Sequence, residues 1–368
     1  MVDSVEPLLV ENVREFARKY VQPIAEKVDS EDWYPKEVVL KMGELGILDP
    51  LHYGVDLHDA MLSLLEIAKV SGSLALIQDA QAELVNAPLR KYLGSRVSDD
   101  LASGKVIGSF ALSEPCCGSD AKAMRTRVRR EGDKLLVNGE KMWITQGLYA
   151  DLFLVFAKDE QGEVKALLVY KDSCVEREKV EVQGNRGTGT ARLRFSNCVV
   201  EREVGGWEVA KYALSIGRIA ISAIALGLAW GAMEEAYAWA SEREVFGKKL
   251  LQHQGIQWTF SESLADLIST SSLLETTCRA FSSDWVRAEP LISALKLTSS
   301  KVANKVVDSM LQVMGGMGYA KGSRVERAYR DVRLTRIGEG SDEVQKLILF
   351  KHLKQIASSG FRTDVSSF

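Results

Sequence analysis

The chain has 368 residues, of which 46% are hydrophobic and 26% are charged, and its formal net charge is −3. This composition is typical of a globular protein long enough for two or three domains. The near balance of charges gives no indication of a nucleic-acid or membrane partner.

The cysteines and the chain start give expectations about compartment. The five cysteines are odd in number and lack metal-ligand spacing, so we expect neither a disulfide framework nor a zinc site. A cytoplasmic location fits this pattern. The start MVDSVEPLLVENVREF is acidic and does not resemble a signal peptide. The most apolar stretch, residues 219–233, is too short to span a bilayer and predicts a core helix packed through small residues.

The first part of the chain reads as helices and the middle as strands. Apolar residues recur at helical spacing from Leu9 to Ile24, and PKEVVLKMGELGI and LHDAMLSLLEIAKV continue the pattern. From about residue 106, TRVRREGDKLLVNGEKMWIT shows short runs separated by the turn signals EGD and NGE. DLFLVFAKDEQGEVKALLVYKD reads as two strands around a polar turn, and ARLRFSNCVV as another strand.

Helical periodicity returns after GGW (205–207) and lasts to the end of the chain. We therefore predict an α+β fold that is mostly α. Its expected parts are a helical domain over 1–105, an antiparallel β-domain over 106–205 and a helical bundle over 206–368.

Four short segments are candidates for binding chemistry. ALSEPCCGSD (111–120) can offer backbone N–H groups and hydroxyls to phosphate, or be an ordinary strand exit. KMWITQG (141–147) places a flat ring beside a hydroxyl, which suits a planar cofactor or a buried core position. GNRGTGT (184–190) matches no phosphate-binding motif and predicts a loop. MGGMGY (314–319) reads as a helix C-cap with a sharp turn.

A carboxylate between two glycines stands out in LTRIGEGSDEVQ (334–345). Ser341, Asp342 and Glu343 read as an N-cap with acids in the first helical turn. Glu339 lies outside this cap, and from the segment alone it is either a solvated acid or a chemical group. The four histidines form no pair at ligand spacing, so we expect no catalytic metal.

The order of these segments resembles the acyl-CoA dehydrogenase family from about residue 35 to about residue 352. FALSEPCCGSD is similar to A-x-T-E-P-x-x-G-S-D, and VNGEKMWITQG to N-G-x-K-x-W-I-T-N. SEREVFGKKLLQHQGIQ is similar to x-x-R-x-x-F-G-x-x-L-x-x-x-Q-x-x-Q. QVMGGMGY, VERAYRD and IGEGSDEVQ are similar to Q-x-x-G-G-x-G-Y, x-E-R-x-x-R-D and I-x-E-G-T-x-E-I-Q.

The resemblance implies a fold and a cofactor. The fold would be an N-terminal helical domain, a central antiparallel β-barrel and a C-terminal four-helix bundle. FAD would lie between the β-domain and the bundle, and a neighbouring subunit of a homotetramer would complete its site. The flavin-binding residues implied in this way are Ser113, Gly118, Ser119, Trp143, Ile144, Thr145 and Ser341 and, for the adenine end of the flavin of the partner subunit, Arg243, Phe246, Gln312 and Gly316.

The resemblance also implies that Glu339 is the catalytic base. It would remove a proton from Cα of an acyl-CoA thioester while a hydride passes from Cβ to flavin N5, which gives a trans-2-enoyl-CoA. The backbone N–H of Glu339 and the flavin 2′-hydroxyl would polarise the thioester carbonyl. Arg218 would stabilise the ionised base and order its loop. Some members carry the base in the earlier helix, where Ile216 and Gly217 offer no carboxylate.

Two departures from the family pattern concern the substrate. Gly338 stands where a tyrosine is common, and PLHYGVDLHD (50–59) differs from the usual segment. We expect electron-transfer flavoprotein as the acceptor, with no nucleic-acid or membrane partner. The alternatives are an acyl-CoA oxidase, an enzyme for acyl groups on a carrier protein, and a flavin-binding regulatory protein without turnover.

Overall fold

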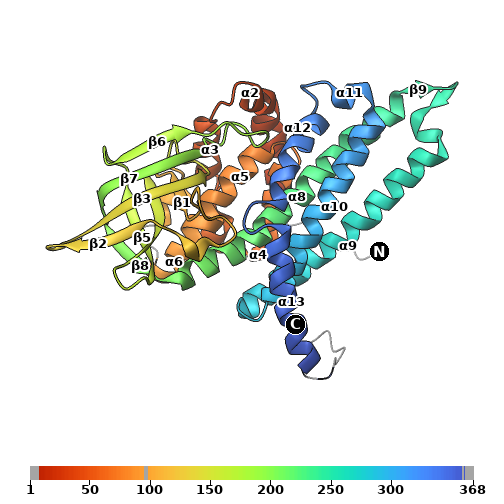
Figure 1. Cartoon of the computed structure of the whole chain (residues 1–368). Helices are drawn as coiled ribbons and strands as arrows, with labels where there is room; N and C mark the ends of the chain where they lie inside the picture. The colour runs from red at the N-terminus through yellow and green to blue at the C-terminus, as the bar shows by residue number, and fades with distance from the viewer. Residues whose placement is uncertain (1–7, 95–97, 359, 361–368) are drawn as a thin grey trace.

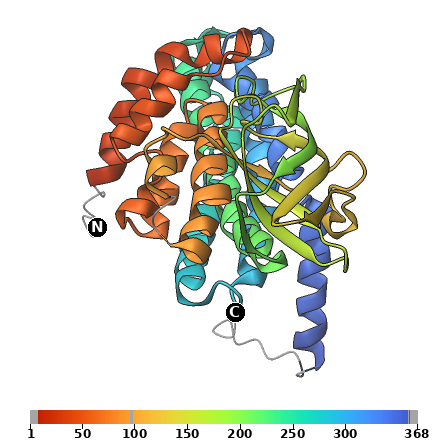
Figure 2. The same ribbon diagram turned by 90° about the vertical axis from the view of Figure 1, so that its left-hand side faces the viewer.

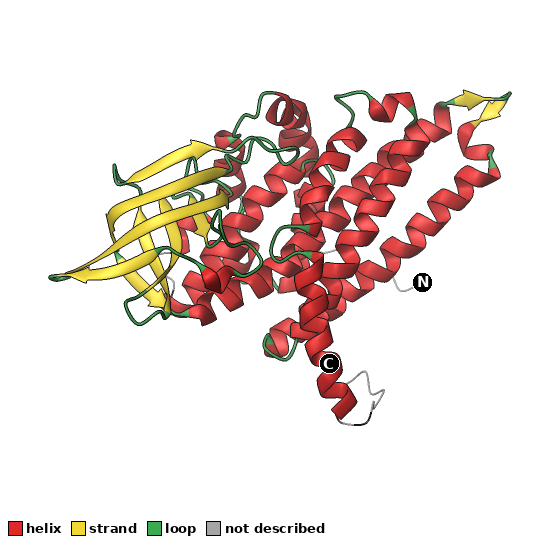
Figure 3. Cartoon of the chain, in the orientation of Figure 1, coloured by secondary structure: helices red, strands yellow, loops and turns green. Residues whose placement is uncertain are grey.

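The computed structural model describes residues 8–94, 98–358 and 360, in which helices precede and follow the strands along the chain and the sheet lies at one end of the molecule (Figures 1 and 3). The element order follows the predicted one, whereas the predicted domain boundaries stay a prediction. The N-terminal helices are α1 (Leu8–Phe16), α2 (Ala25–Ser30), α3 (Lys36–Glu44), α4 (Leu57–Ala68), α5 (Gly72–Gln81), α6 (Ala87–Leu93) and α7 (Ser98–Ala102).

The middle of the chain forms an eight-stranded sheet in the order β6-β7-β3-β2-β4-β5-β8, with β1 beside β4. Its pairs are antiparallel except that β1 and β2 each pair with β4 in parallel. The strands are β1 (Gly108–Ala111), β2 (Arg127–Glu131), β3 (Lys134–Ile144), β4 (Leu152–Lys158), β5 (Val164–Tyr170), β6 (Val175–Lys179), β7 (Ala191–Val199) and β8 (Arg202–Gly205).

Strand β4 is buried on both faces, which explains its unbroken apolar run. Phe153 and Val155 face the main core shared with the N-terminal helices. Leu154 and Phe156 face a second cluster that contains Val85 from the segment after α5. Figure 2 shows the N-terminal helices lying against the sheet. The sheet is therefore fixed to the helices beside the predicted flavin turn.

The C-terminal part is a bundle of long helices (Figure 1). Helices α8 and α9 are joined by a short hairpin of β9 (Glu244–Val245) and β10 (Lys248–Lys249). The helices are α8 (Trp207–Glu242), α9 (Gln254–Asp284), α10 (Glu289–Met314), α11 (Gly316–Tyr319), α12 (Arg324–Asp331) and α13 (Asp342–Ser358).

Helix α8 is the central core helix that the apolar stretch 219–233 predicted. It is long and apolar enough by length and composition to cross a membrane, yet 83% of its most apolar window is buried inside the fold. It packs closely on α4 because small residues face that helix. A Cβ added at Gly227 would lie 2.5 Å from the backbone oxygen of Leu65.

The expectation of no disulfides is wrong. Cys116 is bonded to Cys117, and Cys174 to Cys198, while Cys278 is free and buried. An odd cysteine count leaves one thiol over but does not prevent the others from pairing. Cys174 and Cys198 are distant in sequence, and Ser196 beside Cys198 donates its N–H to the Cys174 oxygen at 3.0 Å.

Candidate active site

Glu339 lies in a short loop between a 3₁₀ turn, Val332–Arg336, and α13. Its backbone is left-handed, with a φ of 56°, a conformation that non-glycine residues adopt rarely and mostly at functional sites. The residue is half-buried, but its Oε2 is enclosed and accepts no hydrogen bond from the described residues. A Cβ added at Gly217 of α8 would lie 2.5 Å from this oxygen. The carboxylate therefore points inward, onto the backbone of α8.

The loop around Glu339 is held by side chains from three helices. The Arg218 Nε on α8 donates to the backbone oxygen of Glu339 at 3.0 Å. The Gln345 amide on α13 donates to the backbone oxygen of Gly340 at 2.9 Å. The Ser300 hydroxyl on α10 lies 3.2 Å from Asp342 Oδ1 at the start of α13. The predicted helix begins at Asp342, so the loop is anchored on both sides.

The Ser341 hydroxyl acts as the predicted cap of α13. It accepts from the backbone N–H of Val344 at 3.4 Å. This contact and one with the Glu343 side chain use the hydroxyl within the chain. Its predicted contact with flavin stays a prediction.

Charges around Glu339 set its protonation. Burial raises the pKa of Glu339, whereas Asp79, Lys296 and Arg218 act to lower it. Burial and the neighbouring Glu339 raise the pKa of Asp79 well above its usual value. These opposite directions favour the proton on Asp79 and the ionised form of Glu339.

The predicted flavin segments lie side by side in the sheet. The Met142 backbone N–H donates to the Ser113 oxygen at 2.9 Å, which joins the end of β1 to β3. The pairing of β3 with β7 is irregular between Lys141 and Ile144, and Trp143 there has a φ of 65°. This irregularity turns the Trp143 ring outward, where it is 58% exposed, while Ile144 is buried.

These segments fit a flat cofactor. A large aromatic ring left exposed beside a polar turn offers a surface that an isoalloxazine can cover. The Thr145 backbone is fixed by the Ser109 hydroxyl, which donates to its oxygen at 2.9 Å. Gly118 and Ser119 are exposed in the turn, and a Cβ at Gly118 would meet no atom within 4 Å. This part of the site is therefore open to a ligand.

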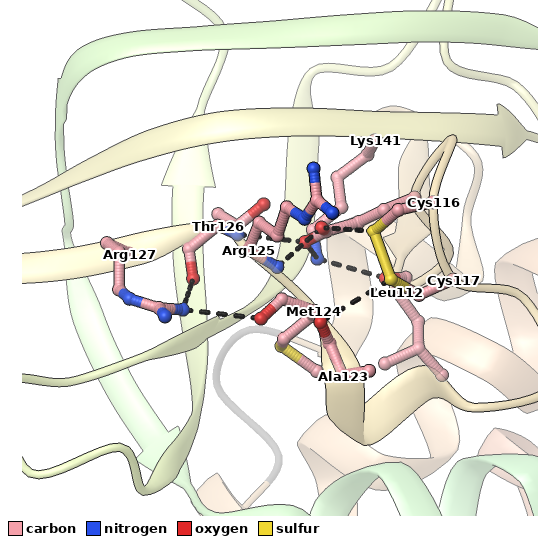
Figure 4. The surroundings of a disulfide bond; sticks show 10 residues. Leu112, Cys116, Cys117, Ala123, Met124, Arg125, Thr126, Arg127 and Lys141 are labelled. Atoms are coloured by element: carbon pink, nitrogen blue, oxygen red, sulfur yellow. Dashed lines mark hydrogen bonds and ion pairs between the residues drawn. A yellow bond between two sulfur atoms is a disulfide. The ribbon is translucent and has the colours of Figure 1, made fainter.

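A buried ion pair that sequence reasoning missed supports this turn (Figure 4). The Lys141 Nζ lies 2.9 Å from Glu114 Oε1 and donates to the Leu112 oxygen, also at 2.9 Å. Glu114 also accepts from the backbone N–H groups of Arg125 and Thr126. Burial lowers the pKa of Lys141 to about 8, against the opposing effect of Glu114. The only signal in the sequence was that the segment 111–120 contains Glu114 and the segment 141–147 contains Lys141.

The same turn carries the disulfide between Cys116 and Cys117 (Figure 4). The odd number of cysteines predicted no disulfide framework. The structure instead links them covalently, and only Cys117 is buried. The Cys117 Sγ also lies 3.4 Å from the Ala123 oxygen, so the turn is closed on itself beside the ion pair.

The residues predicted to reach a partner's flavin lie far from Glu339. Arg243 caps the C-terminal end of α8, 25 residues from Arg218, which is about 37 Å at 1.5 Å per residue. Phe246 in the β9–β10 hairpin is 95% exposed. Gln312 and Gly316 are exposed near the end of α10. One chain therefore cannot bring these residues and Arg218 to the same end of a ligand.

Two acids near Glu339 were also missed by sequence reasoning. Asp79 and Glu83 are 0% and 1% exposed on the segment SLALIQDAQAELVN. Their signal was the presence of two acids, four residues apart, in a stretch that otherwise reads as a buried helix.

Comparisons with known proteins agree along most of the chain. Family models for the N-terminal, middle and C-terminal domains of acyl-CoA dehydrogenase match residues 5–96, 109–198 and 205–354. The short-chain specific acyl-CoA dehydrogenase of Clostridium acetobutylicum is 34% identical over 372 residues, which cover 94% of this chain and 96% of that protein.

Solved structures show the same fold. A glutaryl-CoA dehydrogenase from Mycobacterium smegmatis, in complex with FADH2, matches with a TM-score of 0.91 and 26% identity over 96% of this chain and 95% of that one. A chain from the structure of the electron transferring flavoprotein of Acidaminococcus fermentans matches with a TM-score of 0.89 and 28% identity over 95% and 97%.

Proposed function

Because this chain belongs to the acyl-CoA dehydrogenase family, we propose that it desaturates an acyl-CoA thioester between Cα and Cβ with Glu339 as the base. Family membership makes it an oxidoreductase with FAD as its cofactor. The observation that supports Glu339 is its enclosed carboxylate, on a loop that Arg218 holds through the backbone.

Glu339 can accept a proton only when it is ionised. Asp79, Lys296 and Arg218 all act to lower the pKa of Glu339 and so favour its charged form. The Arg218 Nε lies 3.0 Å from the backbone oxygen of Glu339, so its positive charge is held at the loop. A base on a fixed loop keeps its carboxylate in one orientation toward the α-proton.

Removal of the α-proton places negative charge on the thioester oxygen, and that charge needs hydrogen-bond donors. Within the described residues, no acceptor is bonded to the backbone N–H of Glu339. This N–H is therefore available to a thioester carbonyl. The left-handed backbone of Glu339 and the glycines on either side expose it.

The cofactor site in this proposal uses the open turn of the sheet. FAD, when bound, supplies the acceptor for the hydride that leaves Cβ. Trp143 would cover one face of its ring system, and Ser113, Thr145 and Ser119 would offer hydroxyls. The buried Glu114 and its partners would keep the turn in shape.

The assembly and the acceptor belong to the proposal as well. Arg243 and Phe246 are exposed and remote from Glu339, which supports contact with flavin in a neighbouring subunit of a homotetramer. We propose electron-transfer flavoprotein as the acceptor. We also keep the cytoplasm as the proposed location, although disulfides persist mainly in oxidising compartments.

The test is anaerobic reduction of the flavin. Purified protein should be yellow and should bleach when it is mixed with one member of an acyl-CoA panel. Exposure to air should restore the colour slowly, whereas rapid reoxidation would indicate an oxidase. Light scattering should give four subunits, and a stable monomer with full flavin content would contradict the assembly. A protein that binds FAD but bleaches with no acyl-CoA would overturn the proposed activity.

A further inference from the structure

Two buried acids near the catalytic carboxylate have oxygens that no donor among the described residues reaches. Asp79 lies in the last turn of α5, which ends at Gln81. Glu83 lies in the π-helical turn that follows, Ala82–Asn86. Both oxygens of Asp79 and the Oε2 of Glu83 are buried and accept no hydrogen bond from a donor among the described residues. The Asp79 carboxyl lies within hydrogen-bonding reach of Glu339, whereas the charges that act on Glu83 are those of Asp49, Glu339 and Arg90. Asp79 therefore lies beside Glu339, and Glu83 is close enough for its charge to interact with that of Glu339.

A neighbouring acid shows how this fold treats a buried charge when it has a structural role. Asp49 is fully buried, and its carboxylate accepts from Arg90 at 3.2 Å, from the Asn86 amide at 2.5 Å and from the His52 backbone N–H at 3.1 Å. Asp49 thus has a cation and two further donors. Asp79 has no such set, and for Glu83 the nearby cation is Arg90, which already binds Asp49.

Unpaired carboxyls are costly in a buried site. Buried polar groups are nearly always hydrogen-bonded, and buried charges are paired. Burial raises the pKa of both Asp79 and Glu83, so the acids avoid part of this cost by holding protons. Protonation does not supply the missing donors, and an apolar acyl chain would leave both groups unsatisfied. A ligand with a positive charge and N–H groups would satisfy both.

We propose that Asp79 and Glu83 bind a protonated amine on the acyl group of the thioester substrate. This inference rests on the proposed function of the same site. Because Asp79 reaches the base itself, the amine must lie within a few bonds of the reacting carbons. A positive charge at that distance would also stabilise the negative charge that forms when Glu339 removes the α-proton.

The helix geometry supports one cation between the two acids. Residues four apart on a helix lie on the same face, about 6 Å apart along the axis. Leu84, next to Glu83, lies against the same α8 glycine as the base, because a Cβ at Gly217 would lie 2.6 Å from Leu84 Cδ2 and 2.5 Å from Glu339 Oε2. The π-helical turn and Glu339 therefore meet at the same point of α8.

The test uses two thioesters of the same shape. The cationic one is 4-(dimethylamino)butyryl-CoA, which carries a protonated tertiary amine, and the neutral one is 5-methylhexanoyl-CoA, in which a C–H replaces the N–H. Anaerobic flavin reduction gives kcat/KM for each on the wild-type holoenzyme. We expect the cationic thioester to be preferred on the order of 10–100-fold, as for a buried hydrogen bond to a charged group. Equal values, or a preference for the neutral thioester, would overturn the inference.

Matched variants assign the preference to the two acids. The double variant Asp79→Asn, Glu83→Gln keeps the size of both side chains and should abolish the preference, even if the loss of Asp79 beside the base lowers the rate with both thioesters. Asp100→Asn, which changes an exposed acid on α7, should keep it. A preference that survives in the double variant would show that other groups recognise the amine and would overturn the assignment.

A binding measurement separates this inference from the proposed activity. Glu339→Gln holoenzyme cannot remove the α-proton, so calorimetry can give Kd for both thioesters without turnover. Tighter binding of the cationic thioester by 10-fold or more would support the inference even if wild-type protein bleached with no thioester. Equal binding would overturn it even if wild-type protein bleached with 5-methylhexanoyl-CoA and the proposed activity held.

Discussion

Gly217 is the position at which one methyl group should disturb the base most directly. The Cβ of a Gly217→Ala variant would lie 2.5 Å from Glu339 Oε2, whereas real Cβ contacts begin near 3.0 Å and are ordinary from 3.4 Å. The carboxylate must therefore move by about 0.5–0.9 Å. A misplacement of about 1 Å at a reacting group costs about 10²-fold in rate. We expect the rate of flavin reduction to fall about 10–100-fold, with FAD content unchanged.

The assay is stopped-flow bleaching of the flavin under anaerobic conditions with a saturating acyl-CoA. Gly255→Ala is the matched control, because Gly255 is also in a helix, α9, and its added Cβ meets no atom within 4 Å. The crowding at Gly217 should also lower the free energy of unfolding by about 1–3 kcal/mol. A bleaching rate within about threefold of wild type would refute the packing of Glu339 on Gly217 as the active arrangement.

Three further changes test other parts of the structure. Glu339→Gln should keep FAD and acyl-CoA binding but lose at least about 10²–10⁴-fold in kcat. In the wild-type protein the rate should rise with pH through a pKa above the usual value for glutamate, because burial raises the pKa of Glu339. Gly338→Tyr, at a site where an added Cβ meets only Leu334 at 3.6 Å, should lower kcat/KM for a branched acyl-CoA far more than for a straight one, and equal losses would show that the glycine serves the backbone instead. Burial raises the pKa of Asp331 from 3.8 to about 7, so the folded protein holds its proton more tightly than the unfolded chain, and stability should fall as pH rises from about 4 to 7. Asp331→Asn should reduce this fall in melting temperature, and an unchanged pH profile would contradict the assignment.

The sequence by itself determined the succession of helices, sheet and bundle. Periodicities of 3.6 and 2 are local properties, and they identified the apolar core of α8 and the paired strands β4 and β5 correctly. The motifs around Trp143 and Glu339 identified the family, since each combines residue type with a fixed spacing. The N-cap at Ser341 was also readable, because capping is a contact between residues three apart.

The tertiary structure decided which groups face one another. Glu339 looked like a bare acid between glycines, but folding buries its Oε2 against Gly217, more than a hundred residues earlier in the chain. The buried pairing of Lys141 with Glu114 and the disulfides depend equally on segments that meet only in the sheet. Asp79 became a neighbour of the base for the same reason. Burial and charge pairing are properties of the packed chain, so no local pattern could reveal them.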